Sequence, residues 1–197
     1  MGDGGTRGTS GGVRVLRAAD RPAASWKNGG GVTREIAAGP EGAGMEDFLW
    51  RVSLADVTAD GPFSAFPGVD RTLTLAEGAG MDLTIGGERR LVDERFVPQH
   101  FPGGHPTECR LLGGPVVNFN VMYRTEVVEA EVAVVRGDLA LAVPPRATLL
   151  VVALDGPAAL GDGVRLDPYD AALVADPGPW ALRAAGRAAV VRLTPRP

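Results

Sequence analysis

The fold of this chain is decided by residues 48–85, which read FLWRVSLADVTADGPFSAFPGVDRTLTLAEGAGMDLTI. Short runs of apolar and β-branched residues alternate there with turns that contain glycine and proline, which is the pattern of strands joined by tight connections. Strands are expected at residues 48–57, 72–75 and 81–85. The Gly-Gly pair at 86–87 indicates a tight hairpin to a further strand.

The rest of the chain has the same character, because its 28 glycines and 16 prolines are spread along the sequence and separate short apolar runs. Further strands are expected at residues 13–18, 32–37, 109–112, 116–122, 126–135, 139–143, 148–154, 171–174, 181–184 and 188–193. A turn is expected at Gly137-Asp138 and a break at Gly186. About a dozen strands without a long amphipathic helix predict an all-β protein, either a sandwich or a barrel, with the jelly roll as one solution.

The composition excludes several functional classes. One cysteine cannot form an internal disulfide or a cysteine-built zinc site, and two histidines leave little for a histidine-rich metal centre. A net charge of −4 argues against a nucleic-acid groove. A run of about 18 apolar residues, enough to span a membrane, is absent, and so is the basic-then-apolar order of a signal peptide. We expect a cytoplasmic protein with no metal, no cofactor, and no nucleic-acid or membrane partner.

The first candidate cluster for a site is WKNGGGVTREI, residues 26–36. Lys27 is the single lysine among 20 basic residues, and Asn28 precedes three consecutive glycines. Such glycines can expose backbone N–H groups and allow a ligand to approach closely. The spacing of a phosphate-binding loop is absent. A plain turn between two strands is the alternative interpretation.

The next two clusters place polar side chains beside apolar ones. Strand alternation puts Arg51 and Ser53 on one face of their strand. That face lies either in water or in the polar interior of a barrel, where a guanidinium needs a partner such as a ligand carboxylate. In the third cluster, Phe63 is a candidate apolar wall, with Phe66 as the other choice, and Arg71 begins the following strand. A hairpin connection filled by two aromatic rings is the alternative.

The fourth cluster, GGPVVNFNVM, covers residues 113–122. Alternation places Asn118, Asn120 and Met122 on one strand face. Asparagine is a poor strand former, so two of them indicate either an exposed edge or a polar interior with amide donors and acceptors.

Metal and thiol chemistry have weaker support in this sequence. His100, His105 and Glu108 lie close together, but in a stretch rich in proline and glycine, which favours a solvated loop. Cys109 follows this stretch without an orienting third group, which favours a buried, unreactive thiol.

The four clusters, in this order and spacing, resemble the HutD/Ves family of bacterial proteins. The matching text is WKNGGGVTREIA, FLWRVSLADVTADGPFSAFPGVDRTLTLAEGAGMDL and TECRLLGGPVVNFNVMYR, between Trp26 and Arg124. Residues 1–12 are rich in glycine and contain no apolar run, so we expect a flexible tail there. The resemblance implies an all-β double cupin (bicupin), and we expect a first jelly-roll barrel at 13–123 and a second at 124–197. It also implies a metal-independent regulator of histidine utilisation that binds a small carboxylate, N-formylglutamate or urocanate.

The candidate residues agree chemically with such a ligand. Three cations can balance its carboxylates, three asparagines can meet a formamide or a carboxylate oxygen, and apolar side chains can pack on its stem. The expected ligand-binding residues are Lys27, Asn28, Arg51, Ser53, Phe63, Arg71, Asn118, Asn120 and Met122.

Two other functions stay open from the sequence. One is a cupin-type isomerase or hydrolase that works by acid–base chemistry through Glu35, His100 or Glu108. The other is an interaction module, acting as a homodimer or on another protein, which a large exposed apolar patch on the second barrel would favour.

Overall fold

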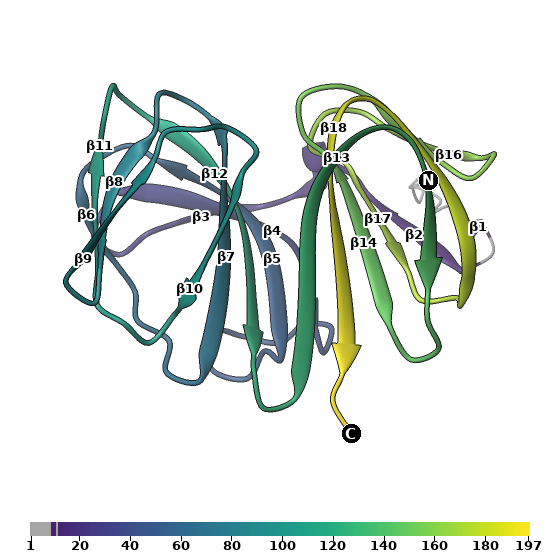
Figure 1. Ribbon diagram of the computed structural model, residues 1–197, viewed down its shortest axis with the longest axis horizontal. Helices are drawn as coiled ribbons and strands as arrows, with labels where there is room; N and C mark the ends of the chain where they lie inside the picture. The colour runs from purple at the N-terminus through teal and green to yellow at the C-terminus, as the bar shows by residue number, and fades with distance from the viewer. Residues whose placement is uncertain (1–8, 11) are drawn as a thin grey trace, which may run out of the picture. The chain divides into compact units, whose positions relative to one another are not determined.

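The structure, a computed structural model, describes residues 9, 10 and 12–197 (Figure 1). These residues form strands joined by short turns, together with a 3-10 helix of a single turn, η1 (Ala18–Asp20). The prediction of an all-β protein is confirmed. No helix within the described residues has the length and hydropathy needed to cross a membrane.

The chain divides into two compact units. The first unit contains Arg21–Val132 and Pro195–Pro197, and the second contains Ala133–Thr194 together with the described part of Met1–Asp20. Of the predicted tail, residues 1–8 and 11 lie outside the described residues, while β1 (Thr9–Ser10) pairs with the strand that follows it. The predicted domain boundary at residue 123 stays a prediction from the sequence.

Two antiparallel sheets form the first unit. The six-stranded sheet has the order β10 (Pro98–Pro102), β7 (Val69–Glu77), β12 (Val116–Arg124), β5 (Trp50–Val57), β4 (Gly31–Gly39) and β3 (Ala23–Ser25). The four-stranded sheet has the order β6 (Gly61–Phe63), β11 (Thr107–Leu111), β8 (Met81–Ile85) and β9 (Glu88–Val92). Figure 1 shows β6, β8, β9 and β11 gathered on the side of the unit away from β4 and β5.

Side chains from both sheets share one apolar core in the first unit. Leu73 and Leu75 of β7 pack in the same cluster as Met81 and Leu83 of β8, and all four are completely buried. Each side chain of this size contributes on the order of 2 kcal/mol through its removal from water. The alternation of apolar and polar residues along these strands therefore determines which face of each sheet points inward.

The predicted hairpin between β8 and β9 is confirmed. Ile85 pairs with Glu88, and the two residues between them, Gly86 and Gly87, have φ angles of 58° and 90°. A two-residue turn with two positive φ angles matches the twist of the strands that it joins, and glycine adopts such angles without strain.

The second unit is built on an eight-stranded sheet. Its order is β1, β2 (Val13–Leu16), β17 (Ala171–Val174), β14 (Thr148–Ala153), β18 (Gly178–Pro195), β15 (Ala158–Leu160) and β16 (Val164–Leu166), and β13 (Val128–Val143) also pairs with β18. Its core is aliphatic and consists of buried valine, alanine and leucine side chains.

Two predicted breaks in this unit are wrong. β13 runs through Gly137-Asp138, where a turn was expected, although Gly137 has a φ of 87°. β18 likewise runs through Gly186. A Cβ atom at Gly186 would lie 2.6 Å from the backbone nitrogen of Gly156. Glycine is needed there because two backbones approach closely, and it does not mark the end of a strand.

A buried carboxylate ties the start of the described chain to this unit. Asp170 accepts hydrogen bonds from Arg17 at 2.6 Å, the Ala18 N–H at 2.7 Å and the Asp167 N–H at 3.2 Å. Burial acts to raise the pKa of Asp170, but these hydrogen bonds outweigh it and hold the pKa below its ordinary value.

Candidate functional site

A cavity of about 640 Å³ lies within the first unit. Side chains on one face of β4, β5, β7 and β12 line it, together with residues of β6 and of the segments that follow β3 and β6. All nine residues that the sequence marked as ligand-binding line this cavity: Lys27, Asn28, Arg51, Ser53, Phe63, Arg71, Asn118, Asn120 and Met122. The structure thus brings them to one place, and that they bind a ligand stays a prediction.

Strand register explains this convergence. Met122 on β12 pairs with Arg51 on β5 at one side and with Arg71 on β7 at the other. Two residues earlier on the same face of β12, Asn120 pairs with Ser53. Directly paired residues point to the same side of a sheet, so the polar faces predicted for the two strands become one polar surface.

Arg71 is the most unusual group in the cavity. It is 9% exposed, and its Nη2 donates a long hydrogen bond of 3.4 Å to Asn120 Oδ1. Its guanidinium lies 5.2 Å from the ring centre of Phe63 and 5.5 Å from that of Phe101. Its Nε is buried without a hydrogen-bond partner, and no carboxylate of the described residues pairs with it. Burial lowers the pKa of Arg71 from its ordinary value to about 10, so the group stays charged at neutral pH.

The second cation of the sheet is already neutralised. Arg51 donates from Nε to Glu35 Oε2 at 2.7 Å, and Glu35 is the partially exposed member of this pair. The partner that the sequence left open for Arg51 is therefore supplied by the chain itself. Arg71, and not Arg51, is the buried cation of the cavity that lacks a counter-ion among the described residues.

Asn118 contributes an unpaired acceptor. Its side chain is 1% exposed, and its Nδ2 donates to the sulfur of Met81 at 3.3 Å. Its Oδ1 is buried and has no hydrogen-bond partner. Buried polar atoms in proteins are almost always paired, so this unpaired oxygen is an exception in the interior of the first unit.

The glycine-rich loop forms a wall of the same cavity. Asn28 Oδ1 accepts a hydrogen bond from the Gly30 N–H at 3.0 Å, which holds the turn together. A Cβ atom at Gly31 would lie 2.5 Å from the Asp56 carbonyl oxygen and 3.2 Å from the Trp26 ring. Lys27 is exposed in this loop. The loop is therefore a turn between two strands, and Trp26, Lys27 and Asn28 at its start line the cavity. That a ligand approaches this loop stays a prediction.

Several lining residues were missed by sequence reasoning. Trp26 meets Phe63 edge-on, with ring centres 6.0 Å apart, and its indole N–H donates to Thr33 at 2.8 Å. Met45 and Glu46 come from the connection between β4 and β5. Trp26 belongs to the first cluster and was available to sequence reasoning, whereas no periodic pattern marks Met45 or Glu46.

The sequence suggested that His100, His105 and Glu108 lie together in one solvated loop. In the structure His100 and Glu108 lie on two different strands. His100 lies on β10, where its Nδ1 is 2.7 Å from the Thr72 hydroxyl, and Glu108 lies on β11 in the other sheet. Among the described residues no group of three or more His, Cys, Asp or Glu side chains is placed to hold a metal ion. The expectation of a protein without a metal stays a prediction.

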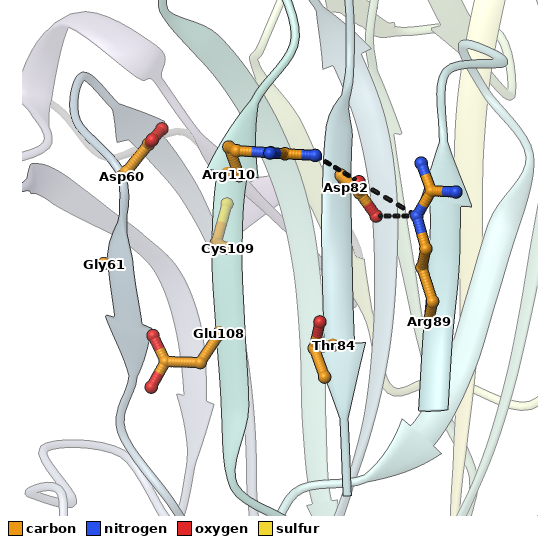
Figure 2. A pocket seen from close by; sticks show the side chains of 8 residues that line it. All are labelled: Asp60, Gly61, Asp82, Thr84, Arg89, Glu108, Cys109 and Arg110. Carbon is orange, nitrogen blue, oxygen red and sulfur yellow. Dashed lines mark hydrogen bonds and ion pairs between the residues drawn. The ribbon is translucent and has the colours of Figure 1, made fainter. Parts of the chain in front are cut away.

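A second depression, of about 580 Å³, lies over the four-stranded sheet (Figure 2). Figure 2 shows Arg110 and Arg89 reaching Asp82 from neighbouring strands, at 2.9 Å and 2.8 Å. The hydrogen bond from Arg89 is the largest cause of a lowered pKa for Asp82. Cys109 beside them is buried, and burial raises the pKa of its thiol to about 12, which agrees with the predicted unreactive thiol. Since the central carboxylate is already paired, this depression is the weaker candidate for a site.

Comparison with solved structures places this architecture in a class. The bacterial pirin YhhW from Escherichia coli, solved in complex with nickel(II), superimposes with a TM-score of 0.71 over 94% of this chain and 100% of that one, at 10% sequence identity. At that identity the likeness concerns the fold alone. The chain is a cupin-like all-β protein of the two-barrel type, with a polar cavity in its first unit.

Closer relatives give the family. The family model described as HutD matches residues 18–192. HutD from Pseudomonas fluorescens SBW25, solved in a formate condition, is 35% identical with a TM-score of 0.85, covering 94% of this chain and 100% of that one. A protein of unknown function from Pseudomonas aeruginosa PAO1 is 32% identical with a TM-score of 0.81, covering 94% and 99%. The chain therefore belongs to the HutD family, and the predicted family and double-cupin fold are confirmed.

Two curated relatives match over part of their length. A 21.2 kDa protein from the hutC 3′ region of Pseudomonas putida is 40% identical over 111 residues, 56% of this chain and 58% of that protein. Protein Ves of Cronobacter sakazakii is 39% identical over 114 residues, 57% and 61% of the two chains. The match thus spans about three fifths of each curated relative, and the first links the family to the histidine-utilisation gene region.

Proposed function

We propose that this protein is a metal-independent regulator in the cytoplasm that binds a small carboxylate of histidine degradation in the cavity of its first unit. N-formylglutamate and urocanate are the ligands with the appropriate chemistry. The family membership supports the pathway, because one relative lies in the hutC region. The chemistry of the cavity supports the ligand class.

A single observation carries the proposal: Arg71 is a buried guanidinium without a counter-ion among the described residues. An unpaired buried charge is costly, so a fold that retains one without using it would be unstable for no benefit. Guanidinium binds carboxylate through two parallel hydrogen bonds, and Arg71 Nε has no hydrogen-bond partner within the described residues. A ligand carboxylate is the natural counter-ion.

The remaining charges of the cavity fit the two ligands differently. Urocanate brings one carboxylate, which Arg71 accepts. N-formylglutamate brings two, and its second carboxylate would face Lys27 in the exposed loop, because Arg51 is already paired with Glu35. Phe63 and Met122 provide the apolar contact for the stem or ring of either ligand.

Binding is favoured over catalysis by the residues that line the cavity. The acid–base groups of the enzymatic alternative are dispersed: Glu35 is paired with Arg51, His100 lies against Thr72, and Glu108 lies over the other sheet. Among the described lining residues Glu46 is the one carboxylate, and there is no histidine or cysteine, the donors that transition metals prefer.

An interaction module has less support. Within the described residues, the large apolar side chains that are exposed all belong to the first unit: Met45, Leu49, Leu91, Leu112 and Val127. The apolar patch on the second barrel that would favour this function is not among them. Assembly as a homodimer stays part of the proposal, and sedimentation equilibrium measures the mass that decides it.

The experiment is calorimetric titration of the protein with N-formyl-L-glutamate, urocanate and glutarate, with NMR of the same samples to detect turnover. We expect saturable binding of at least one of them without loss of ligand over time. Arg71→Met should abolish this binding, while Arg136→Met, on the exposed surface of β13, should leave it unchanged. Absence of binding by all three carboxylates refutes the proposal, and consumption of a bound ligand establishes the enzymatic alternative instead.

A further inference from the structure

We infer that the outer face of the four-stranded sheet in the first unit is a docking surface for a second copy of this chain. Strands β6, β11, β8 and β9 form this face, which Figure 2 shows. The inference takes up the homodimer included in the proposed function and names its surface. It does not depend on which ligand the cavity binds.

Two large apolar side chains are exposed on this face. Leu91 on β9 pairs with Asp82 on β8, and Leu112 follows Arg110 by two residues, so both leucines point to the same side of the sheet as these charged residues. Leu91 is 47% exposed and Leu112 is 43% exposed. They provide apolar area that a second molecule can remove from water.

One buried carboxylate holds two arginines in place on this face. Asp82 is 7% exposed and accepts hydrogen bonds from Arg89 Nε at 2.8 Å and from Arg110 Nη2 at 2.9 Å. The side chains of Arg89 and Arg110 are nevertheless 70% and 69% exposed. One carboxylate balances one guanidinium, so a net positive charge remains on side chains whose positions are already fixed, which lowers the entropic cost of binding through them.

The other half of the face is acidic. Figure 2 shows Asp60 beside β6 and Glu108 on β11, with the Glu108 side chain directed toward β6. Both residues are exposed, and neither takes part in an ion pair among the described residues. Arg110 belongs to the same strand as Glu108, but its guanidinium reaches across to Asp82 on β8. The face is therefore negative over β6 and β11 and positive over β8 and β9.

A surface divided in this way is complementary to itself. A two-fold axis that lies in the contact plane, along the strands and between β11 and β8, lays the β6–β11 half of one copy over the β8–β9 half of the other. Each acidic half then meets a basic half, and symmetry repeats the contact. A molecule with a single sign of charge would be repelled by one of the halves, which favours a second copy as the occupant.

The strand register identifies the residues that meet. Pro62, Glu108, Thr84 and Arg89 form one row across the four strands. The two-fold axis reverses this row, so Arg89 at one end lies over Pro62 at the other end, beside the Glu108 carboxylate of the second copy. The central contact of the dimer is therefore an ion pair between Arg89 and Glu108, formed twice.

The contact is small. Strands β8, β9 and β11 have five residues each and β6 has three, so the face measures roughly 15 by 17 Å. Interfaces of this size belong to reversible complexes. We expect a monomer–dimer equilibrium with a dissociation constant in the micromolar range.

Sedimentation equilibrium of the full chain at about 1–500 μM measures this equilibrium. Glu108→Arg and Arg89→Glu should each raise the dissociation constant about 10-fold or more, because each turns both symmetric attractions into repulsions. Glu126→Arg and Arg136→Glu make the same changes of charge at exposed positions outside this face, and they should leave the dissociation constant unchanged.

A mixture of the two charge-reversal variants tests the contact itself. In a mixed dimer of Glu108→Arg with Arg89→Glu, opposite charges meet again at both contacts. Mixing should therefore restore dimerisation to within about threefold of the wild-type dissociation constant. If Arg89→Glu does not fold because Asp82 loses a hydrogen bond, Leu91→Glu replaces it as a second disruption of the face and should weaken the dimer about 10-fold.

Three results would overturn the inference. They are a wild-type protein that stays monomeric at about 500 μM, a dimer that Glu108→Arg and Leu91→Glu leave unchanged, and a mixture of the folded charge-reversal variants that does not dimerise. The second result keeps the proposed homodimer and moves its surface elsewhere. Carboxylate binding is measured separately by calorimetry, and since Glu108 lies outside the cavity, Glu108→Arg should bind as the wild type does. Loss of carboxylate binding by the wild type would defeat the proposed ligand and leave this docking surface standing.

Discussion

Replacing Arg71 with methionine is expected to stabilise the unliganded protein while removing carboxylate binding. Burial lowers the pKa of Arg71 from its ordinary value to about 10. At about 1.4 kcal/mol for each pKa unit, keeping the guanidinium charged in the fold costs about 3 kcal/mol. The rings of Phe63 and Phe101 offset about 0.5–1 kcal/mol each. A methionine of similar length avoids this cost, so we expect a gain of about 1–2 kcal/mol in the free energy of unfolding.

The sign of the effect holds over the whole practical pH range. A lowered pKa means that the folded state disfavours the charged form, and this penalty is fully present at any pH below about 10. It is relieved only above about pH 10, where folded Arg71 loses its proton before the unfolded chain does. The gain from Arg71→Met is therefore the same at pH 6 as at pH 8.

Urea denaturation at pH 7 without ligand measures this difference. A rise in the midpoint at unchanged m-value, with a thermal shift of about 2–4 °C for each kcal/mol, is the expected result. Arg136→Met is the matched control, since the same substitution on an exposed strand should change stability by less than about 0.5 kcal/mol. Destabilisation by more than about 1 kcal/mol would refute the reasoning, because Arg71 would then stabilise the empty fold instead of awaiting a ligand.

Four further predictions concern single positions. Lys27→Ala should weaken carboxylate binding about two- to fivefold at low salt and hardly at all in about 1 M salt. The affinity of Lys27→Arg should lie between those of the wild type and Lys27→Ala. Equal affinities of the wild type and Lys27→Ala at low salt would exclude a role for the ammonium. Asp170→Asn should lower stability by about 1–3 kcal/mol at pH 7. Because the pKa of Asp170 is lowered, its carboxylate contributes to the free energy of unfolding above about pH 4, and this contribution is lost as the pH falls further. The stabilities of the wild type and Asp170→Asn should therefore converge in acid denaturation. Stability curves that stay parallel down to low pH would contradict this. Gly31→Ala should lower the free energy of unfolding by about 2–4 kcal/mol, as measured by thermal unfolding. Gly30→Ala, whose Cβ meets only ordinary contacts, should lower it by about 1 kcal/mol or less. Similar losses of stability in the two variants would contradict the crowding at Gly31. Cys109 should react with iodoacetamide in urea but not in the folded protein, since burial raises its pKa to about 12; rapid labelling without urea would show that the thiol is accessible.

Local patterns in the sequence predicted most strands because alternation is a property of neighbouring residues. The hairpin at Gly86 and Gly87 and the faces of β5 and β12 follow from this period of two. Very short strands such as β6 and β15 escaped detection, because three residues carry too little pattern. Gly137 and Gly186 were misread since a glycine that ends a strand and one that permits a close backbone approach look alike in sequence.

The sequence by itself determined the all-β class, the HutD family resemblance and the list of polar residues gathered around the cavity. Only the tertiary structure decided which of them are free to act. Pairing across β4, β5, β12 and β7 joins residues far apart in the chain, and this register gives Arg51 a carboxylate partner while leaving Arg71 and Asn118 with unpaired atoms. Composition and alternation specify which face a side chain takes, but the partner it meets there depends on long-range strand pairing that no local pattern encodes.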